Sequence, residues 1–129
     1  MNATEKRQNP RIELNRPVPV RLPNGDTRDD LVKNISLSGM TLECDSATAD
    51  IIIPADQSID PDDPPVVSLA VTLPIGENDV SMELGCRVRY RIAGPGGRIN
   101  IGLEFRDVRT ENLRAFWQFI EESLLPKET

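Results

Sequence analysis

The stretch VPVRLPNGDTRDDLVKNISLSGMTLEC, residues 18–44, contains three strand patterns separated by two turn signals. In its first and last parts, apolar side chains alternate with other residues, which is the period of a half-buried strand. Pro23-Asn24-Gly25-Asp26 is a hairpin signal, because Asn-Gly tolerates the positive φ that tight turns need. A second strand over residues 27–35 ends at the turn residues Ser36-Leu37-Ser38-Gly39. The stretch therefore predicts consecutive antiparallel strands.

Strand patterns continue toward the C-terminus in residues 66–73, 80–92 and 99–105. On the 80–92 strand, alternation places Arg87, Arg89 and Arg91 together on an exposed face. The connection over residues 45–65 is acidic, and its three isoleucines at 51–53 could form a short strand, whereas its prolines favour a long connection without one. The sequence therefore predicts six or seven strands, and their short antiparallel connections favour a small barrel.

The period changes after the last strand pattern, where the sequence predicts a single amphipathic helix. Thr110 is the expected N-cap, and Pro126 ends the pattern. Apolar residues recur at steps of three and four, and all of them, including the only tryptophan, are interpreted as core: Leu113, Phe116, Trp117, Ile120 and Leu124. The predicted fold class is mainly β, a small antiparallel barrel with one C-terminal α-helix.

Composition excludes several classes of function. The 129 residues weigh 14.4 kDa, which is the size of one domain. The chain has no histidine, so Ser-His-Asp triads, Cys-His pairs and His-ligated zinc are excluded. Its two cysteines, Cys44 and Cys86, are too few for a disulfide scaffold and are interpreted as small buried hydrophobic residues. With no acid–base pair or activated nucleophile evident, we expect no enzymatic activity, no metal and no cofactor.

Charge is unevenly distributed along the chain. The net charge is −6, yet residues 1–28 contain six basic and three acidic side chains, whereas residues 43–63 are acidic without a base. An acidic chain that is 4% aromatic is a poor ligand for DNA or RNA, which require many basic contacts and stacking side chains. The N-terminus lacks the apolar run of a signal peptide, and no stretch is long enough to span a membrane. We therefore expect a cytoplasmic protein.

Two clusters of residues have the chemistry of a small-anion site. The first is Lys6, Arg7 and Arg11, in a proline-containing segment that is predicted to be flexible over residues 1–15, ahead of a barrel domain over 16–125. Guanidinium groups bind phosphate in bidentate fashion and stack on flat bases. Two arginines four positions apart could therefore hold a ligand from two sides.

The second cluster is Asn34-Ile35-Ser36-Leu37-Ser38-Gly39, at a junction between two strands. Asn34 and Ser36 fall on one face by alternation, and Gly39 is expected to adopt a backbone conformation that other residues resist. Such a corner could hydrogen-bond a base edge or a phosphate oxygen. The alternative is that these residues only build the turn. The late run Gly102-Leu103-Glu104-Phe105 is interpreted as structural, with Gly102 allowing a close approach.

Together these motifs resemble the PilZ domain family. Arg7 and Arg11 match the family's Arg-x-x-x-Arg motif, and Asn34, Ser36 and Gly39 match its Asp/Asn-x-Ser-x-x-Gly motif. The run at residues 101–105 and the C-terminal helix also fit, so the resemblance covers about residues 5–122. The family often has an aromatic residue between the two arginines, where this chain has Asn9-Pro10.

The resemblance implies a bacterial receptor for cyclic di-GMP that acts as a monomer or dimer and signals to a separate downstream protein. It implies that Arg7 and Arg11 grip phosphate and guanine, with help from Lys6. It also implies that Asn34 and Ser36 contact the ligand and that Gly39 keeps the corner open. Ligand binding would then change the conformation of the N-terminal segment. The alternative implied by the same family is a protein-interaction module that binds no nucleotide.

Overall fold

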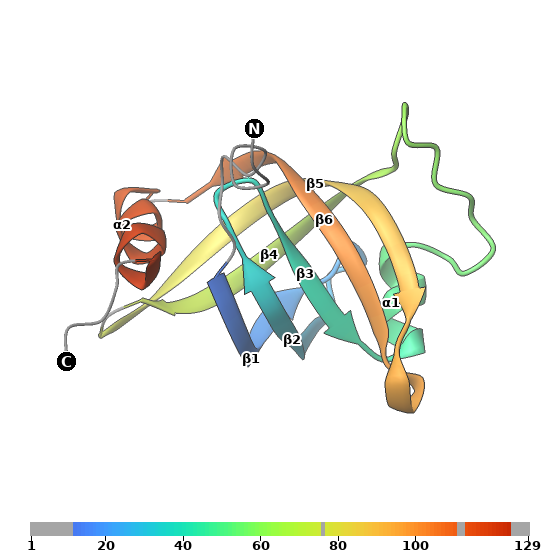
Figure 1. The fold of residues 1–129 in the computed structure, drawn as a ribbon, viewed down its shortest axis with the longest axis horizontal. Coiled ribbons are helices and arrows are strands. Elements are labelled where there is room, and N and C mark those ends of the chain that lie inside the picture. Colours follow the sequence, from blue (N-terminus) through green and yellow to red (C-terminus); the bar gives the residue numbers. More distant parts are fainter. Residues whose placement is uncertain (1–11, 76, 111–112, 125–129) are drawn as a thin grey trace, which may run out of the picture.

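The computed structural model of the chain describes residues 12–75, 77–110 and 113–124. Over these residues the chain forms six strands and two α-helices (Figure 1). In chain order they are β1 (Ile12–Arg21), β2 (Thr27–Ile35), β3 (Gly39–Cys44), α1 (Ser46–Ile52), β4 (Val66–Ile75), β5 (Asn78–Ala93), β6 (Ile99–Arg109) and α2 (Leu113–Leu124). The prediction of a mainly β fold with a C-terminal helix is confirmed.

The strands close into an antiparallel barrel in the order β1-β2-β3-β6-β5-β4. Most neighbours pair along much of their length, and β3 pairs with β6 from Gly39↔Glu104 to Cys44↔Ile99. β1 and β4 instead pair at only two positions, Val20↔Val71 and Arg21↔Ala70. We call this short junction the β1–β4 seam. Pro74 is tolerated in β4 because it lies beyond the seam, where β4 pairs with β5 alone among the described strands.

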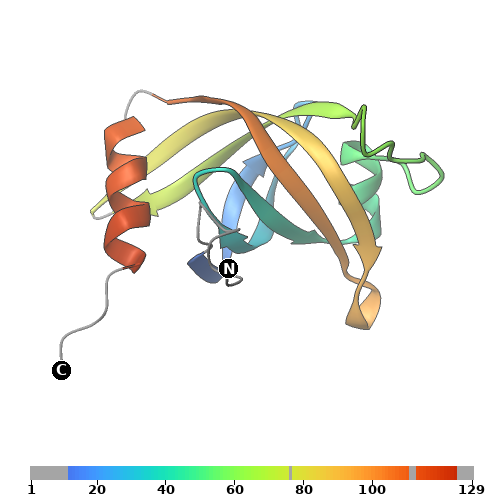
Figure 2. The ribbon, with the colours of Figure 1, turned by 45° about the horizontal axis from the view of Figure 1, so that its top comes forward.

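Helix α2 packs at the end of the barrel and contacts β1 and β4 (Figure 2). Phe116 and Ile120 lie one turn apart on the helix and are 1% and 2% exposed. Burial of such side chains contributes about 1.5–3 kcal/mol each. The helix therefore covers the region where β1 and β4 diverge. Trp117 was predicted to be core, but it is 52% exposed because it lies on the edge of the apolar stripe, next to Phe116.

The first strand begins ahead of the predicted start of the barrel domain at residue 16. β1 begins at Ile12, so the expected division between a flexible segment and the barrel at residues 15 and 16 falls inside a strand. The register of β1 shifts between Glu13 and Arg16, and Asn15 there has φ 47°, a conformation that Asn tolerates better than most residues. At the other end, the Thr110 hydroxyl donates to the Ser81 carbonyl oxygen at 2.9 Å. Residues 111 and 112 lie outside the described residues, so Thr110 as the N-cap of α2 stays a prediction.

Of the two alternatives for residues 51–53, a short strand or a long connection, the strand does not form, because residues 46–52 form helix α1. The Asp45 carboxylate caps this helix by accepting from the Thr48 backbone N–H at 2.7 Å. Ala49, Ile52 and Ile53 are buried against the barrel end. The candidate seventh strand is therefore a helix, and the barrel has six strands.

The barrel interior is aliphatic, as the shortage of aromatic residues requires. Cys44 and Cys86 are fully buried in it, which confirms them as core residues, and burial raises the pKa of each thiol to about 12. The largest fully buried side chains are Phe116, Ile35, Met40, Leu42, Ile53, Leu73, Met82, Leu84, Ile101, Val18, Val20 and Val32.

Among the described residues no helix is long and apolar enough to cross a membrane.

One acidic side chain is buried inside β2 without full compensation. Asp30 is 5% exposed, and its Oδ2 atom has no hydrogen-bond partner among the described residues. Burial raises the pKa of Asp30, and the nearby Asp45 carboxylate raises it further, while Arg98 and Arg28 oppose the shift. The folded state therefore binds the proton more tightly than the unfolded chain does.

The raised pKa of Asp30 predicts how this residue affects stability at different pH values. At neutral pH the ionised carboxylate destabilises the fold, and this cost disappears as the pH falls through the raised folded-state pKa toward the ordinary value of 3.8. We expect Asp30→Asn to raise the melting temperature at pH 7 and to change it little near pH 4. The exposed neighbour Asp29 provides the control, since Asp29→Asn should have little effect at either pH. A lower melting temperature for Asp30→Asn at pH 7 would show that the ionised carboxylate is stabilising.

Candidate functional site

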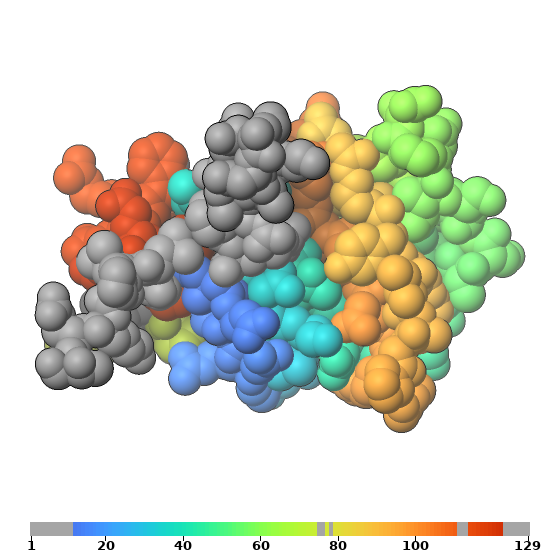
Figure 3. All heavy atoms as spheres, viewed as in Figure 1, coloured from blue at the N-terminus to red at the C-terminus, as the bar shows by residue number. Residues whose placement is uncertain are grey.

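Residues 34–39, which we call the corner, join β2 to β3. Asn34 is half-buried near the end of β2 and pairs with Glu13 of β1 and Thr41 of β3. The β2–β3 register shifts between Val32 and Asn34, so the regular alternation of the strand is interrupted just before the corner. The outer surface of these strands continues onto β6 and β5 in the face shown in Figure 3.

Ser36 holds the turn together. Its side chain is fully buried, and its Oγ accepts from the Ser38 backbone N–H at 3.1 Å and lies 3.1 Å from the Ser38 Oγ. The Ser36 backbone N–H donates to the Gly39 carbonyl oxygen at 2.8 Å. Alternation predicts that Ser36 and Asn34 share one face, but Ser36 is buried and only Asn34 is partly exposed. A direct ligand contact of Ser36 stays a prediction, whereas its part in building the turn is evident.

Gly39 is required for close packing, not for an unusual backbone conformation. Gly39 is not among the described glycines with positive φ, which are Gly25, Gly96 and Gly97. A Cβ at position 39 would instead lie 2.3 Å from the backbone oxygen of Leu103 on β6. The Ser38 carbonyl oxygen also accepts from the Phe105 backbone N–H at 2.8 Å. The corner is therefore fixed against β6, and the predicted reason for Gly39 is corrected.

An aromatic side chain crosses the outer surface beside the corner. Tyr90 on β5 pairs with Gly102 on β6, and a Cβ on Gly102 would lie 2.1 Å from the Tyr90 ring. The Tyr90 hydroxyl lies 3.2 Å from the Thr41 Oγ1 atom, and Thr41 pairs in turn with Asn34. The predicted close approach at Gly102 is confirmed, and it lets the tyrosine reach across β6 toward β3.

Glu104 of β6 lies directly opposite Gly39 and forms a cluster with two arginines of β5. Arg89 donates to the Glu104 Oε1 atom from Nε at 3.1 Å and also from Nη2. The Arg87 Nη1 atom lies 3.6 Å from the same oxygen. We call these three residues the Glu104 cluster. Sequence analysis missed it by interpreting residue 104 as structural, although three alternating arginines upstream signalled that a neighbouring strand must carry acidic partners.

The arginines of β5 do not share one exposed face. The β5–β6 register shifts between Val88 and Tyr90, so Arg91 turns toward α1. Its side chain is 14% exposed, and Nη1 donates to the Asp50 carboxylate at 2.8 Å and to the Ile53 carbonyl oxygen at 2.7 Å. The predicted exposure of Arg91 is therefore wrong, while Arg89 is exposed and also donates to the Pro61 carbonyl oxygen.

The remaining candidates, Lys6, Arg7 and Arg11, lie outside the described residues. The described chain begins at Ile12, which pairs with Ile35 at the corner. The structure therefore brings Asn34, Ser36 and Gly39 together and leaves the arginine motif as a prediction.

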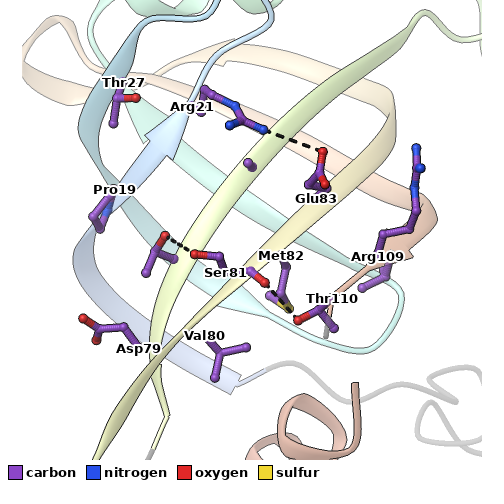
Figure 4. Close-up of a pocket in the computed structure, with 13 residues that line it drawn as sticks. Pro19, Arg21, Thr27, Asp79, Val80, Ser81, Met82, Glu83, Arg109 and Thr110 are labelled. Atoms are coloured by element: carbon purple, nitrogen blue, oxygen red, sulfur yellow. Dashed lines mark hydrogen bonds and ion pairs between the residues drawn. The ribbon is translucent and has the colours of Figure 1, made fainter. Parts of the chain in front are cut away.

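A groove of about 1120 Å³ lies away from the corner over β1, β4 and β5 (Figure 4). Arg21 there pairs with Glu83 at 3.7 Å, and Asp79 adds a second carboxylate. Arg109 also lines the groove, so its two arginines and two carboxylates leave no net positive charge to attract a phosphate. Within the described ranges no three His, Cys, Asp or Glu side chains gather closely enough to hold a metal ion.

Comparisons with known proteins agree with the fold. A family model described as PilZ domain matches residues 5–122. No curated protein matches the chain. The chain is similar to the Bacillus subtilis inhibitor of motility (MotI/DgrA), with a TM-score of 0.67 and 19% identity over 95% of this chain and 53% of that one. It thus spans about half the length of that protein. It is also similar to the PilZ domain with c-di-GMP of YcgR from Escherichia coli, with a TM-score of 0.48 and 17% identity over 92% and 91% of the two chains.

Proposed function

This chain belongs to the PilZ domain family, and from that membership we propose that it is a non-enzymatic receptor for cyclic di-GMP. The observation that carries the proposal is that the family match, over residues 5–122, includes the arginine motif and the corner together. The start of β1 supports it further. Ile12 pairs with Ile35 beside Ser36, and Arg11 is covalently bonded to Ile12.

The proposed ligand has two phosphates and two guanine bases, and the candidate residues have matching chemistry. Arg7 and Arg11 would hold phosphate oxygens in bidentate fashion and stack on guanine, with Lys6 adding positive charge. Asn34 would hydrogen-bond a guanine edge or a phosphate. Ser36 and Gly39 would act mainly by fixing the corner, as their burial and their contacts with Ser38 and Leu103 support.

Binding would change the conformation of the N-terminal segment and so signal to a separate protein in the bacterial cytoplasm. The expected change is a transition of residues 5–14 to a more protected state when ligand is bound. Hydrogen exchange measures it, and unchanged exchange in these residues at saturating ligand would contradict this part of the proposal.

A second candidate function is a protein-interaction module of the same fold that binds no nucleotide. Trp117 favours it, because an exposed tryptophan is a side chain enriched in protein interfaces. A direct measurement of cyclic di-GMP binding distinguishes the two candidate functions.

That measurement is an isothermal titration of cyclic di-GMP into the purified protein, with GMP as the control ligand. We expect micromolar or tighter binding of cyclic di-GMP, and stoichiometry follows from the same curve. Because the ligand binds the folded state, a hundredfold excess over Kd should stabilise the protein by about 2.7 kcal/mol and raise its melting temperature. No heat together with an unmoved melting temperature would reject the receptor and favour the interaction module.

A further inference from the structure

Only one of the two oxygens of the Glu104 carboxylate has partners among the described residues. Both Arg89 hydrogen bonds and the Arg87 contact fall on Oε1. Among the described residues, Oε2 has no hydrogen-bond partner. The two guanidinium groups fix the orientation of the carboxylate, so the direction in which Oε2 can accept hydrogen bonds is set.

The position of Glu104 places this acceptor beside the corner. Glu104 pairs with Gly39 across the β3–β6 ladder, and neighbouring strands lie about 4.8 Å apart. On β6 it follows the outward Gly102, which the Tyr90 ring covers, with the buried Leu103 between them. The side chains of Arg87, Arg89 and Glu104 are 38%, 40% and 39% exposed, so a ligand at the corner can reach them.

We propose that Glu104 selects guanine in the bound dinucleotide by accepting hydrogen bonds from the guanine N1–H and N2–H groups at Oε2. This inference rests on the proposed function, because it assigns a further contact to the same ligand. Arg87 and Arg89 act as positioning residues that hold the carboxylate toward the base. Asn34 and the arginine motif keep the roles proposed above.

The chemistry of the base edges explains the selection. Guanine presents two adjacent donors, N1–H and the exocyclic N2–H, and the two lone pairs of a carboxylate oxygen can accept both. Hypoxanthine has N1–H but lacks the exocyclic amine, so it loses one contact. Adenine presents an acceptor at N1, which a carboxylate repels. A site that hydrogen-bonds a base edge discriminates against an analogue that lacks one of the bonding groups.

The first test compares cyclic di-GMP with cyclic di-IMP, which differs only by the two exocyclic amines. Titration into the wild-type protein should give a Kd for cyclic di-IMP at least about tenfold higher, which corresponds to roughly 1.4 kcal/mol. Cyclic di-AMP should bind more weakly again. Equal Kd values for cyclic di-GMP and cyclic di-IMP would overturn the inference while leaving the receptor intact. Failure to bind any cyclic dinucleotide would remove the proposed function and the inference with it.

The second test is Glu104→Gln, which nearly preserves shape. Because Arg87 and Arg89 can only donate, they select the amide orientation that places oxygen at Oε1 and the NH₂ group at Oε2. This NH₂ group would face the guanine donors. We expect the Kd for cyclic di-GMP to rise about tenfold or more and the preference over cyclic di-IMP to disappear.

Glu83→Gln is the matched control, since Glu83 is an exposed carboxylate on β5 paired with Arg21 away from the corner. Glu83→Gln should leave the Kd for cyclic di-GMP and the Kd for cyclic di-IMP unchanged. Exposed ion pairs contribute little to stability, so both variants should keep the wild-type melting temperature. An unchanged affinity in Glu104→Gln would contradict the inference. A tighter affinity would also do so, because it would show that the carboxylate only repels the phosphates.

Discussion

Gly39→Ala is expected to lower the free energy of unfolding by about 3 kcal/mol. The added Cβ would lie 2.3 Å from the Leu103 backbone oxygen and 3.3 Å from the Glu104 Cα atom. A backbone oxygen cannot rotate away as a side chain can, so β3 and β6 must separate where the corner is attached. Chemical denaturation without ligand measures the effect, because the loss does not depend on nucleotide.

Gly85→Ala is the matched control for Gly39→Ala, because it also adds one methyl group to a barrel strand. Its Cβ would meet the Cβ of Asp107 at 3.3 Å, which a shift of a few tenths of an ångström relieves, whereas the contact at Gly39 is a full ångström closer. We expect a change within about 1 kcal/mol, since the lower entropy of the unfolded alanine chain partly offsets the contact. Equal stability for wild type and Gly39→Ala would show that β3 and β6 adjust freely, and the corner would then owe its glycine to the ligand.

Arg11→Ala is expected to raise the Kd for cyclic di-GMP by at least roughly 25-fold. Removing one guanidinium from a desolvated phosphate contact costs about 2–5 kcal/mol, in part because the partner charge is left unpaired. The melting temperature of the ligand-free variant should equal that of the wild type if Arg11 serves only the ligand. Titration calorimetry measures the first quantity and thermal denaturation the second.

Arg109→Ala controls for general loss of positive charge. Arg109 is exposed at the end of β6, in the groove of Figure 4, and its removal changes the net charge by the same amount. Charges separated by more than a Debye length of about 8 Å are largely screened at physiological salt, so affinity should change less than twofold. Similar losses in both variants would mean that the ligand responds to overall charge and not to a site at Arg11.

Much of the barrel could be predicted from sequence because its signals are local. Strands β2 and β3 and the turns at Asn24-Gly25 and at residues 36–39 follow from alternation and turn chemistry. Helix α1 was missed although Asp45 and Thr48 provide a capping pair, because three consecutive β-branched isoleucines favour a strand. Whether Trp117 is buried or exposed depends on how α2 is rotated against β1 and β4, and only tertiary packing determines that rotation.

The candidate site was only partly predictable for a related reason. Register shifts near Asn34 and at Arg89 break the two-residue period, and no local pattern announces them. Arg91 therefore faces Asp50 instead of solvent, and Ser36 is buried beside the partly exposed Asn34. Glu104 belongs to the candidate site because two arginines on another strand contact it, and these residues become neighbours only when the barrel forms.

The β1–β4 seam has a consequence for the order in which the chain folds. Every other strand pair makes a longer ladder, and four of these ladders join strands that follow one another in sequence. The seam joins Val20 with Val71, about fifty positions apart, so its formation requires the closure of a long loop. Only two residue pairs offset the entropy cost of that closure. Such non-local pairings slow folding. Closure at the seam should therefore be the last step of assembly, completed when α2 docks on β1 and β4.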